Sequence, residues 1–81
     1  MTWEEIKQSG STHYKTGTIE PIDLLRDLEP HADLTALEVK ALTDNIKYSF
    51  RMLRNGLNPS DLGKIQHYTA MCQWRLQEEL T

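Results

Sequence analysis

The sequence predicts an all-α fold, a small bundle of three to four helices built around a long antiparallel helix pair. Two segments, about residues 35–54 and 58–80, carry apolar residues at helical spacing, and residues typical of helix starts precede both. Strand signals are weak along the whole chain. A length of 81 residues fits a single small helical domain, 1–81, whose modest core would gain stability from oligomerisation.

The first predicted element is a short amphipathic helix over residues 2–8. Thr2 is a suitable N-cap, and Glu5 follows three residues later as in a capping box. Trp3 and Ile6 give this helix its apolar contacts. The polar run at residues 9–12 ends it, and a loop continues to about Gly17.

A second helix is predicted from Pro21. Proline suits the first helical turn, because the amide hydrogen that it lacks would have no partner there. Ile22, Leu25 and Leu28 mark the side expected to be buried, and Pro30 should end the helix. In the simplest architecture this helix packs across the long pair.

The two long helices have clear start and stop signals. Thr35 and Glu38 form a capping box that opens the third helix, Gly56 stops it, and Asn58 with Pro59 opens the fourth. The predicted core face of the third helix is Val39, Leu42, Ile46, Phe50, Leu53 and Leu57. That of the fourth is Leu62, Ile65, Thr69, Cys72, Leu76 and Leu80.

Bulk composition limits the class of protein. The net charge is −3 and the isoelectric point about 5.5, which argues against a general nucleic-acid coat. The single cysteine, Cys72, permits neither an intrachain disulfide nor a cysteine-rich zinc site, and on its apolar helix face it is expected in the core. No stretch has the ~20 apolar residues of a membrane span, and the N-terminus does not read as a signal peptide. We therefore expect a cytoplasmic protein with no membrane partner.

Polar side chains form two stripes beside these core faces. On the third helix the basic residues Lys40, Lys47, Arg51 and Arg54 lie within about 60° of each other. On the fourth, one edge carries Lys64, Tyr68 and Arg75, with Asp61 a turn earlier. In an antiparallel pair the two stripes can line one groove. Arginine forks and lysine point charges are suited to phosphate oxygens, and tyrosines can stack on a base.

The same residues have a structural interpretation. Basic residues on a helix edge are usually a solvated face, and Lys40 and Arg54 can pair with nearby acids. Tyr48 and Tyr68 can be aromatics at the edge of the core. Asp61 favours the helix dipole from the first turn without any other role. Only the joint placement on two helices favours a binding site.

His13 is the candidate general acid/base or phosphate donor, because imidazole titrates near neutral pH. A loop histidine bonded to a helix end is the alternative. No Walker A loop, nucleophile elbow or metal-ligand spacing is present. Trp74 and Met71 face away from the expected core, which indicates a subunit interface, with packing of the N-terminal helix as the competing explanation.

These residues also carry a resemblance to a known family. The chain has His13-Tyr14, Gly17, Ile19-Glu20 and Ile22-Asp23, then Ile46-Lys47-Tyr48 and Arg51, then Asp61-Leu62, Lys64 and Tyr68. In this order they resemble the pattern of small phage proteins described as nucleotide-kinase-like, or SaV-like, over roughly residues 13–76. The resemblance divides the chain into an N-terminal helix and linker, 1–12, and a family-like core, 13–80.

The resemblance implies nucleotide handling, and for some members nucleoside-monophosphate kinase activity with ATP and Mg²⁺. It implies a location in the cytoplasm of an infected bacterial host. A homo-oligomer is expected as well, because a site shared between subunits would give so short a chain room for donor, acceptor and Mg²⁺. One position departs from the family pattern, because Asp44 stands where an asparagine is usual. An acid there would repel a phosphate, or it could serve Mg²⁺ or a ribose hydroxyl.

The sequence therefore predicts a binder of a nucleotide or related phosphorylated ligand. The expected ligand-binding residues are His13, Tyr14, Lys47, Tyr48, Arg51, Asp61, Lys64 and Tyr68, with His13 as the catalytic candidate and no dedicated metal site. Three classes stay open: a nucleotide kinase, a non-catalytic protein that sequesters a nucleotide, and a module that binds a host protein.

Overall fold

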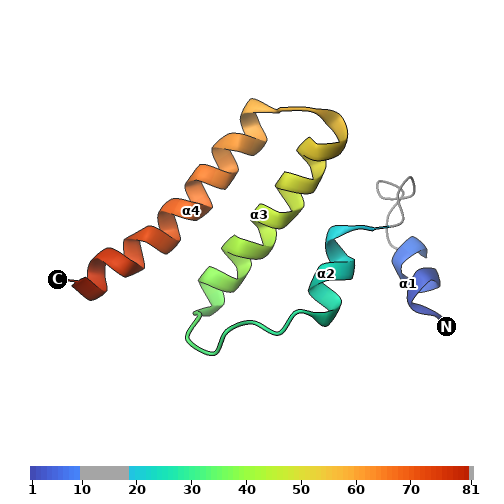
Figure 1. Ribbon diagram of the computed structural model, residues 1–81, viewed down its shortest axis with the longest axis horizontal. Helices are drawn as coiled ribbons and strands as arrows, with labels where there is room; N and C mark the ends of the chain where they lie inside the picture. Colours follow the sequence, from blue (N-terminus) through green and yellow to red (C-terminus); the bar gives the residue numbers. More distant parts are fainter. Residues whose placement is uncertain (10–18, 81) are drawn as a thin grey trace.

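The structure is a computed structural model that describes residues 1–9 and 19–80. Within these residues the chain forms four helices and the segments that connect them (Figure 1). The helices are α1 (Trp3–Ser9), α2 (Pro21–Asp27), α3 (Ala36–Asn55) and α4 (Pro59–Leu80), and the described residues contain no strand. The predicted all-α fold with a long antiparallel pair is confirmed. The predictions for His13 and Tyr14 fall outside the described residues.

Local signals in the sequence set the ends of α3. The Thr35 hydroxyl accepts a hydrogen bond from the Glu38 amide at 3.2 Å, and the Glu38 carboxylate accepts one from the Thr35 amide at 2.9 Å. Gly56 ends the helix with φ at +92°, and its amide donates to the Met52 carbonyl at 2.8 Å. Residues with a side chain rarely adopt a φ of this value, so glycine is required at this turn.

The other helices begin where the sequence indicates. The Thr2 hydroxyl accepts from the Glu5 amide at 3.1 Å, and the Asn58 side chain accepts from the Asp61 amide at 3.1 Å. Pro21 occupies the first turn of α2. This helix ends at Asp27, earlier than the expected stop at Pro30.

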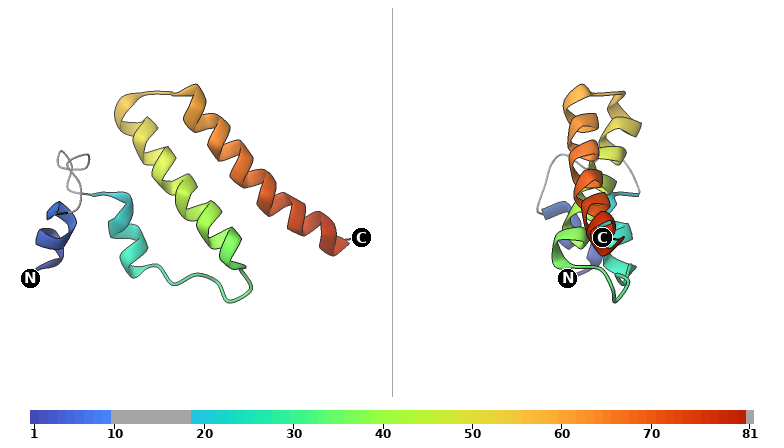
Figure 2. Two further views of the ribbon diagram at one scale, coloured as in Figure 1. Left: turned by 180° about the vertical axis from the view of Figure 1, so that it is seen from behind. Right: turned by 90° about the vertical axis from the view of Figure 1, so that its left-hand side faces the viewer.

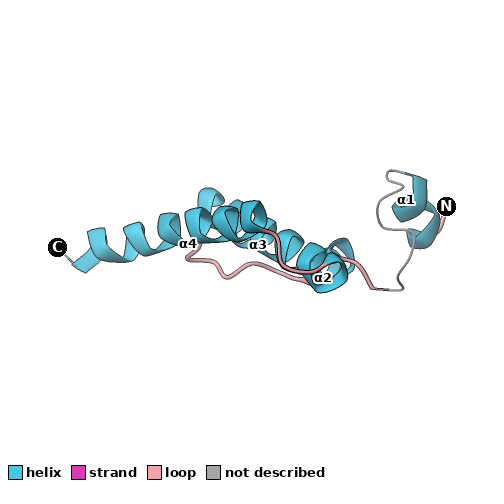
Figure 3. Cartoon of the chain, turned by 90° about the horizontal axis from the view of Figure 1, so that it is seen from above, coloured by secondary structure: helices cyan, strands magenta, loops and turns pink. Residues whose placement is uncertain are grey.

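The helices form a single layer. In Figure 1, α3 lies between α4 on one side and α2 on the other, and α1 lies beyond α2. Figures 2 and 3 show the same layer from behind, edge-on and from above. The molecule measures 48 × 31 × 15 Å, and its radius of gyration is 15.0 Å, against about 12 Å for a compact chain of this length. In the described residues α2 contacts α3 and not α4, so the prediction that it packs across the pair is wrong.

Few apolar side chains are buried in this layer. Within residues 1–9 and 19–80 the buried hydrophobic residues are Ala41 and Tyr48. The predicted core face is wrong for the single chain, because Leu53 is 83% exposed and Leu76 is 59% exposed. Neither α2 nor α1 covers that face, so its leucines stay in contact with solvent.

Polar and aromatic residues join α3 to α4 instead. Arg75 forms an ion pair with Glu38, and Arg51 lies 3.4 Å from Asp61. The rings of Tyr48 and Tyr68 are nearly parallel, with an interplanar angle of 8°. These contacts place the two polar stripes against each other.

Arg75 connects the N-terminal end of α3 to the C-terminal part of α4. It bonds Glu38 of α3, Glu79 at 2.9 Å and the carbonyl of Asp33 at 3.1 Å. The Thr35 amide, and then Arg75, lower the pKa of the Glu38 carboxyl, and Glu38 in turn raises the pKa of Arg75. Each group therefore keeps its charge at neutral pH.

Candidate functional site

Three cationic side chains surround the ring of Tyr48. The charged groups of Lys47, Arg51 and Lys64 lie 5.3, 5.7 and 5.1 Å from the ring centre. We call these three residues the cation cluster. Two come from α3 and one from α4, and the buried ring holds them near each other through cation–π attraction.

The cation cluster carries an excess of positive charge. Any two of its charged groups lie within about 11 Å of each other, because each is less than 6 Å from the same ring centre. Asp61 supplies one negative charge through Arg51. In the described part of the chain neither Lys47 nor Lys64 forms an ion pair. Three cations and one carboxylate leave a local charge of +2.

Lys40 belongs to the same stripe, but its charge is neutralised. Its ammonium lies 2.6 Å from the Asp44 carboxylate, a helical i,i+4 pair, and 5.9 Å from the Tyr68 ring. The hydrogen bond that the Lys40 ammonium donates to Asp44 raises the pKa of Lys40. The acid at position 44 therefore balances a cation that the cation cluster does not include.

The two tyrosine rings lie too close together to admit a base between them. Their centres are 6.4 Å apart, and the separation of two nearly parallel planes cannot exceed that distance. A planar base needs about 7 Å between the ring planes, twice the ~3.5 Å contact distance of carbon atoms. Tyr48 is also 8% exposed. Its ring therefore organises the surrounding cations and offers little surface for stacking.

Asp61 is the most buried charged residue of the site. Its side chain is 2% exposed, one carboxylate oxygen lies 3.4 Å from Arg51, and the other has no hydrogen-bond partner within the described residues. A buried oxygen without a donor is unfavourable. Because this oxygen is buried, a ligand beside Arg51 would reach it only after neighbouring side chains move.

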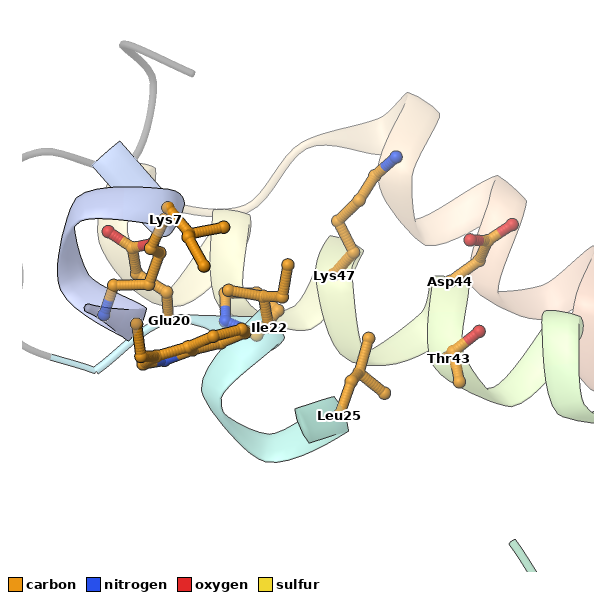
Figure 4. A pocket seen from close by; sticks show the side chains of 10 residues that line it. Lys7, Glu20, Ile22, Leu25, Thr43, Asp44 and Lys47 are labelled. Carbon is orange, nitrogen blue, oxygen red and sulfur yellow. The ribbon is translucent and has the colours of Figure 1, made fainter. Parts of the chain in front are cut away.

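A cavity of about 380 Å³ lies between α1, α2 and α3. Its walls are mainly apolar, from Trp3, Ile6, Pro21, Ile22 and Leu25. Charged groups line it as well, among them Glu20 and Lys47. Figure 4 shows Ile22 and Leu25 pointing from α2 toward α3, with Lys47 rising from α3 at the cavity edge. Lys47 thus belongs both to this cavity and to the cation cluster.

One carboxylate fixes α1 beside the cavity. Asp23 of α2 accepts hydrogen bonds from the Trp3 indole at 2.9 Å, from Lys7 at 3.0 and 3.1 Å, and from the Glu20 amide at 2.7 Å. The Trp3 bond, then those of Lys7 and Glu20, lowers the pKa of Asp23 from 3.8 to about 2. Asp23 also raises the pKa of Lys7.

The structure brings together six of the eight residues expected to bind ligand. The Tyr48 ring is surrounded by four of them, Lys47, Arg51, Lys64 and Tyr68. Asp61 is connected to this group by its ion pair with Arg51. His13 and Tyr14 lie outside the described residues. Arg54, the fourth basic residue predicted on the α3 stripe, is not part of the cation cluster. Its guanidinium instead donates a hydrogen bond to the Ile19 carbonyl at 3.3 Å.

Sequence reasoning missed the cavity. Trp3 and Lys7, which help to line it, are four residues apart and so share one face of α1, and that spacing was the available signal. No local sequence pattern predicts that Asp23 accepts hydrogen bonds from Trp3 and Lys7 of α1, because these residues are far apart in the chain.

A second hollow of about 270 Å³ lies where α3 meets α4, lined by Leu37, His67, Ala70, Met71 and Trp74. Trp74 is 60% exposed there. The two residues expected at a subunit interface, Met71 and Trp74, thus share one surface.

The described residues contain neither a cluster of metal ligands nor a membrane-spanning helix. No three side chains of His, Cys, Asp or Glu converge there, and the Asp44 carboxylate, the expected Mg²⁺ candidate, bonds the Lys40 ammonium. None of the described helices combines the length and the apolar character needed to cross a bilayer.

Comparison with known proteins places most of the chain in one family. Residues 7–70 match the model of the family described as protein of unknown function DUF3310, and the chain belongs to that family. The matched residues contain the whole cation cluster. A search among curated proteins and a search among solved structures each found no match.

Proposed function

We propose that this DUF3310 protein binds a small phosphorylated ligand at the cation cluster, with a nucleoside monophosphate as the leading candidate. The observation that carries the proposal is the local charge of +2 around Tyr48. A phosphate monoester carries between −1.5 and −2 charges at pH 7. It would relieve the repulsion among three cations held close together.

The chemical types of the three cations support a phosphate as the ligand group. Arg51 offers a planar fork of N–H donors, and it is about half exposed, so those donors are accessible. Lys47 and Lys64 add mobile point charges.

The cavity supports a ligand with an apolar ring as well as a phosphate. Its volume of about 380 Å³ is within the ~300–1,000 Å³ range of small-molecule sites, and its walls are mainly apolar. Because Lys47 lines the cavity and also contacts the Tyr48 ring, one ligand can place a base in the cavity and its phosphate on the cation cluster.

A thermal-shift screen tests the proposal. The purified chain is heated with nucleoside mono-, di- and triphosphates and cyclic nucleotides, with and without Mg²⁺, and with inorganic phosphate for comparison. A ligand at 100 times its dissociation constant adds about 2.7 kcal/mol, a shift on the order of 10–20 °C for a domain of this size. No shift with any nucleotide, while the chain is folded, would overturn the proposal.

Turnover distinguishes the two nucleotide-dependent classes. A kinase predicts conversion of the bound monophosphate to the diphosphate when ATP and Mg²⁺ are added, which requires donor, acceptor and metal held in line. A sequestering protein predicts stoichiometric binding and recovery of intact ligand. The variant His13→Ala tests the catalytic expectation: in a kinase it should lower turnover by a larger factor than it weakens binding. The cytoplasm of a phage-infected bacterium, with its nucleotide pools, is the compartment that goes with this proposal.

A host-protein partner is the second candidate. The exposed Trp74 beside the hollow of about 270 Å³ favours it, since aromatic residues are enriched at protein interfaces. This function predicts that Trp74→Ala abolishes capture of the partner and leaves nucleotide binding unchanged. The result of the nucleotide screen decides between the two candidates.

A further inference from the structure

The two long helices present an uncovered apolar surface. We call it the apolar face, and it consists of Val39, Leu42, Ile46, Phe50 and Leu53 on α3 and Leu62, Ile65, Thr69, Cys72, Leu76 and Leu80 on α4. Its five leucines are between 40% and 86% exposed. Large exposed apolar surfaces on a small domain mark interaction sites.

This surface and the cation cluster lie on opposite sides of the layer. Successive residues of a helix are rotated by about 100° about its axis. On α3, Glu38, Ala41 and Tyr48 mark the direction that faces α4, and the apolar residues point about 130° away from that direction. The side chains of Lys47 and Arg51 point about 110° away from it in the opposite sense of rotation. On α4 the apolar residues centre about 90° from the line of Asp61, Tyr68 and Arg75, again on the opposite side from Lys64. When two antiparallel helices face each other, residues rotated in the same sense from the contact line, each along its own chain direction, lie on the same side of the helix layer.

We infer that the apolar face is the contact surface between two copies of this chain, which pair as two helix hairpins into a four-helix bundle. The inference is independent of the ligand proposed for the cation cluster. A second copy supplies what the single chain lacks, because few apolar residues of the described part are buried, namely Ala41, Tyr48 and Pro21.

Its size agrees with a dimer contact. Helices of 20 and 22 residues are about 30 and 33 Å long, and two adjacent helices are about 20 Å wide. The resulting plan area of about 600 Å² corresponds to a larger accessible area, because side chains make the surface uneven. A standard interface buries about 800 Å² on each partner.

The absence of charge favours a second copy over other occupants. The arcs of α3 and α4 that hold the apolar face contain no Asp, Glu, Lys or Arg. Gln66, Gln73 and Gln77 border it on α4. A surface that pairs with itself must avoid clusters of one sign, which would repel each other. A membrane surface would instead favour lysine and arginine along the border and an overall positive charge, whereas the net charge here is −3.

Sedimentation of the full chain at micromolar concentration tests the inference. The wild type should sediment as a dimer or a multiple of it. Leu53→Glu with Leu76→Glu puts charges at both ends of the apolar face, on residues that are already exposed, and should raise the dissociation constant about a hundredfold or more. Trp74→Glu, on the other side, is the matched control and should leave association unchanged.

A charge-complementation experiment separates lost association from lost folding. The variant Leu53→Lys with Leu76→Lys should also be monomeric, yet mixing it with the glutamate variant should restore a heterodimer. A monomeric wild type would overturn the inference. So would dissociation by Trp74→Glu alone, or flotation of a monomeric wild type with vesicles of phosphatidylcholine and phosphatidylglycerol.

Discussion

Lysines that look equivalent in the sequence should differ in their effect on ligand affinity. Among the described residues no carboxylate pairs with Lys47 or Lys64 beside Tyr48, whereas Lys40 is paired with Asp44 at 2.6 Å. A hydrogen bond to a charged group contributes about 1.5–3 kcal/mol, and partial exposure lowers that to about 1.4 kcal/mol for each lysine. Each of Lys47→Gln and Lys64→Gln should therefore weaken binding about tenfold. Together they bring the local charge from +2 to zero and should weaken it about a hundredfold.

Isothermal titration with the nucleoside monophosphate of largest thermal shift measures these changes. The matched control is Lys40→Gln with Asp44→Asn, which removes one charge of each sign and should leave the dissociation constant within about twofold. Circular dichroism verifies that every variant is folded. If the variant lacking both Lys47 and Lys64 binds as the wild type does, the cation cluster is not the ligand site. A control pair as damaging as the double variant would equally refute the charge reasoning.

Two further predictions concern the fold. Gly56→Ala should lower the free energy of unfolding by about 1–3 kcal/mol in urea titrations, because φ is +92° there. No neighbouring atom lies within 4 Å of an added methyl, so the loss would come from backbone strain and not from a clash. D-alanine at this position, made by chemical ligation, should leave the free energy of unfolding unchanged, and an equal loss from both substitutions would contradict the strain. The lowered pKa of Asp23 contributes stability above its ordinary value of 3.8, lost as the pH falls toward about 2. Trp3 fluorescence in Trp74→Phe should follow that loss, and Asp23→Asn should abolish the transition.

Sequence reasoning located the helices because their boundaries depend on near neighbours. The Thr35 and Glu38 box, the Asn58 cap and the Gly56 stop each involve groups within four residues of one another. Such signals are readable from a single chain. The early end of α2 is the exception among them.

The core face could not be read in the same way. Helical spacing of leucines shows which side of α3 is apolar, and it does not reveal whether another element covers that side. The helix pair meets instead through ion pairs and the two tyrosines. The sequence offered these stripes as a binding site or as a solvated edge with aromatics beside the core, and not as ion pairs between the two helices. The spacing of Lys47, Arg51 and Lys64 was sufficient to group them, because antiparallel pairing of two helices fixes which edges meet.

The cavity depends on contacts between distant segments. Asp23 bonds Trp3 and Lys7 across 20 and 16 residues, and no local pattern specifies that pairing. Its apolar residues were assigned to two separate short helices, Trp3 and Ile6 to the first and Pro21, Ile22 and Leu25 to the second. Only the folded arrangement shows that they surround one space.

The thickness of the helix layer bears on how ligand would bind to a dimer. Two copies joined by their apolar faces would hold the cation clusters on opposite outer surfaces, separated by about 30 Å, twice the 15 Å thickness of one layer. The Debye length at physiological salt is about 8 Å, so occupation of one cluster would not change the field at the other. Such a dimer takes up one ligand per chain with a hyperbolic isotherm and a Hill coefficient of one.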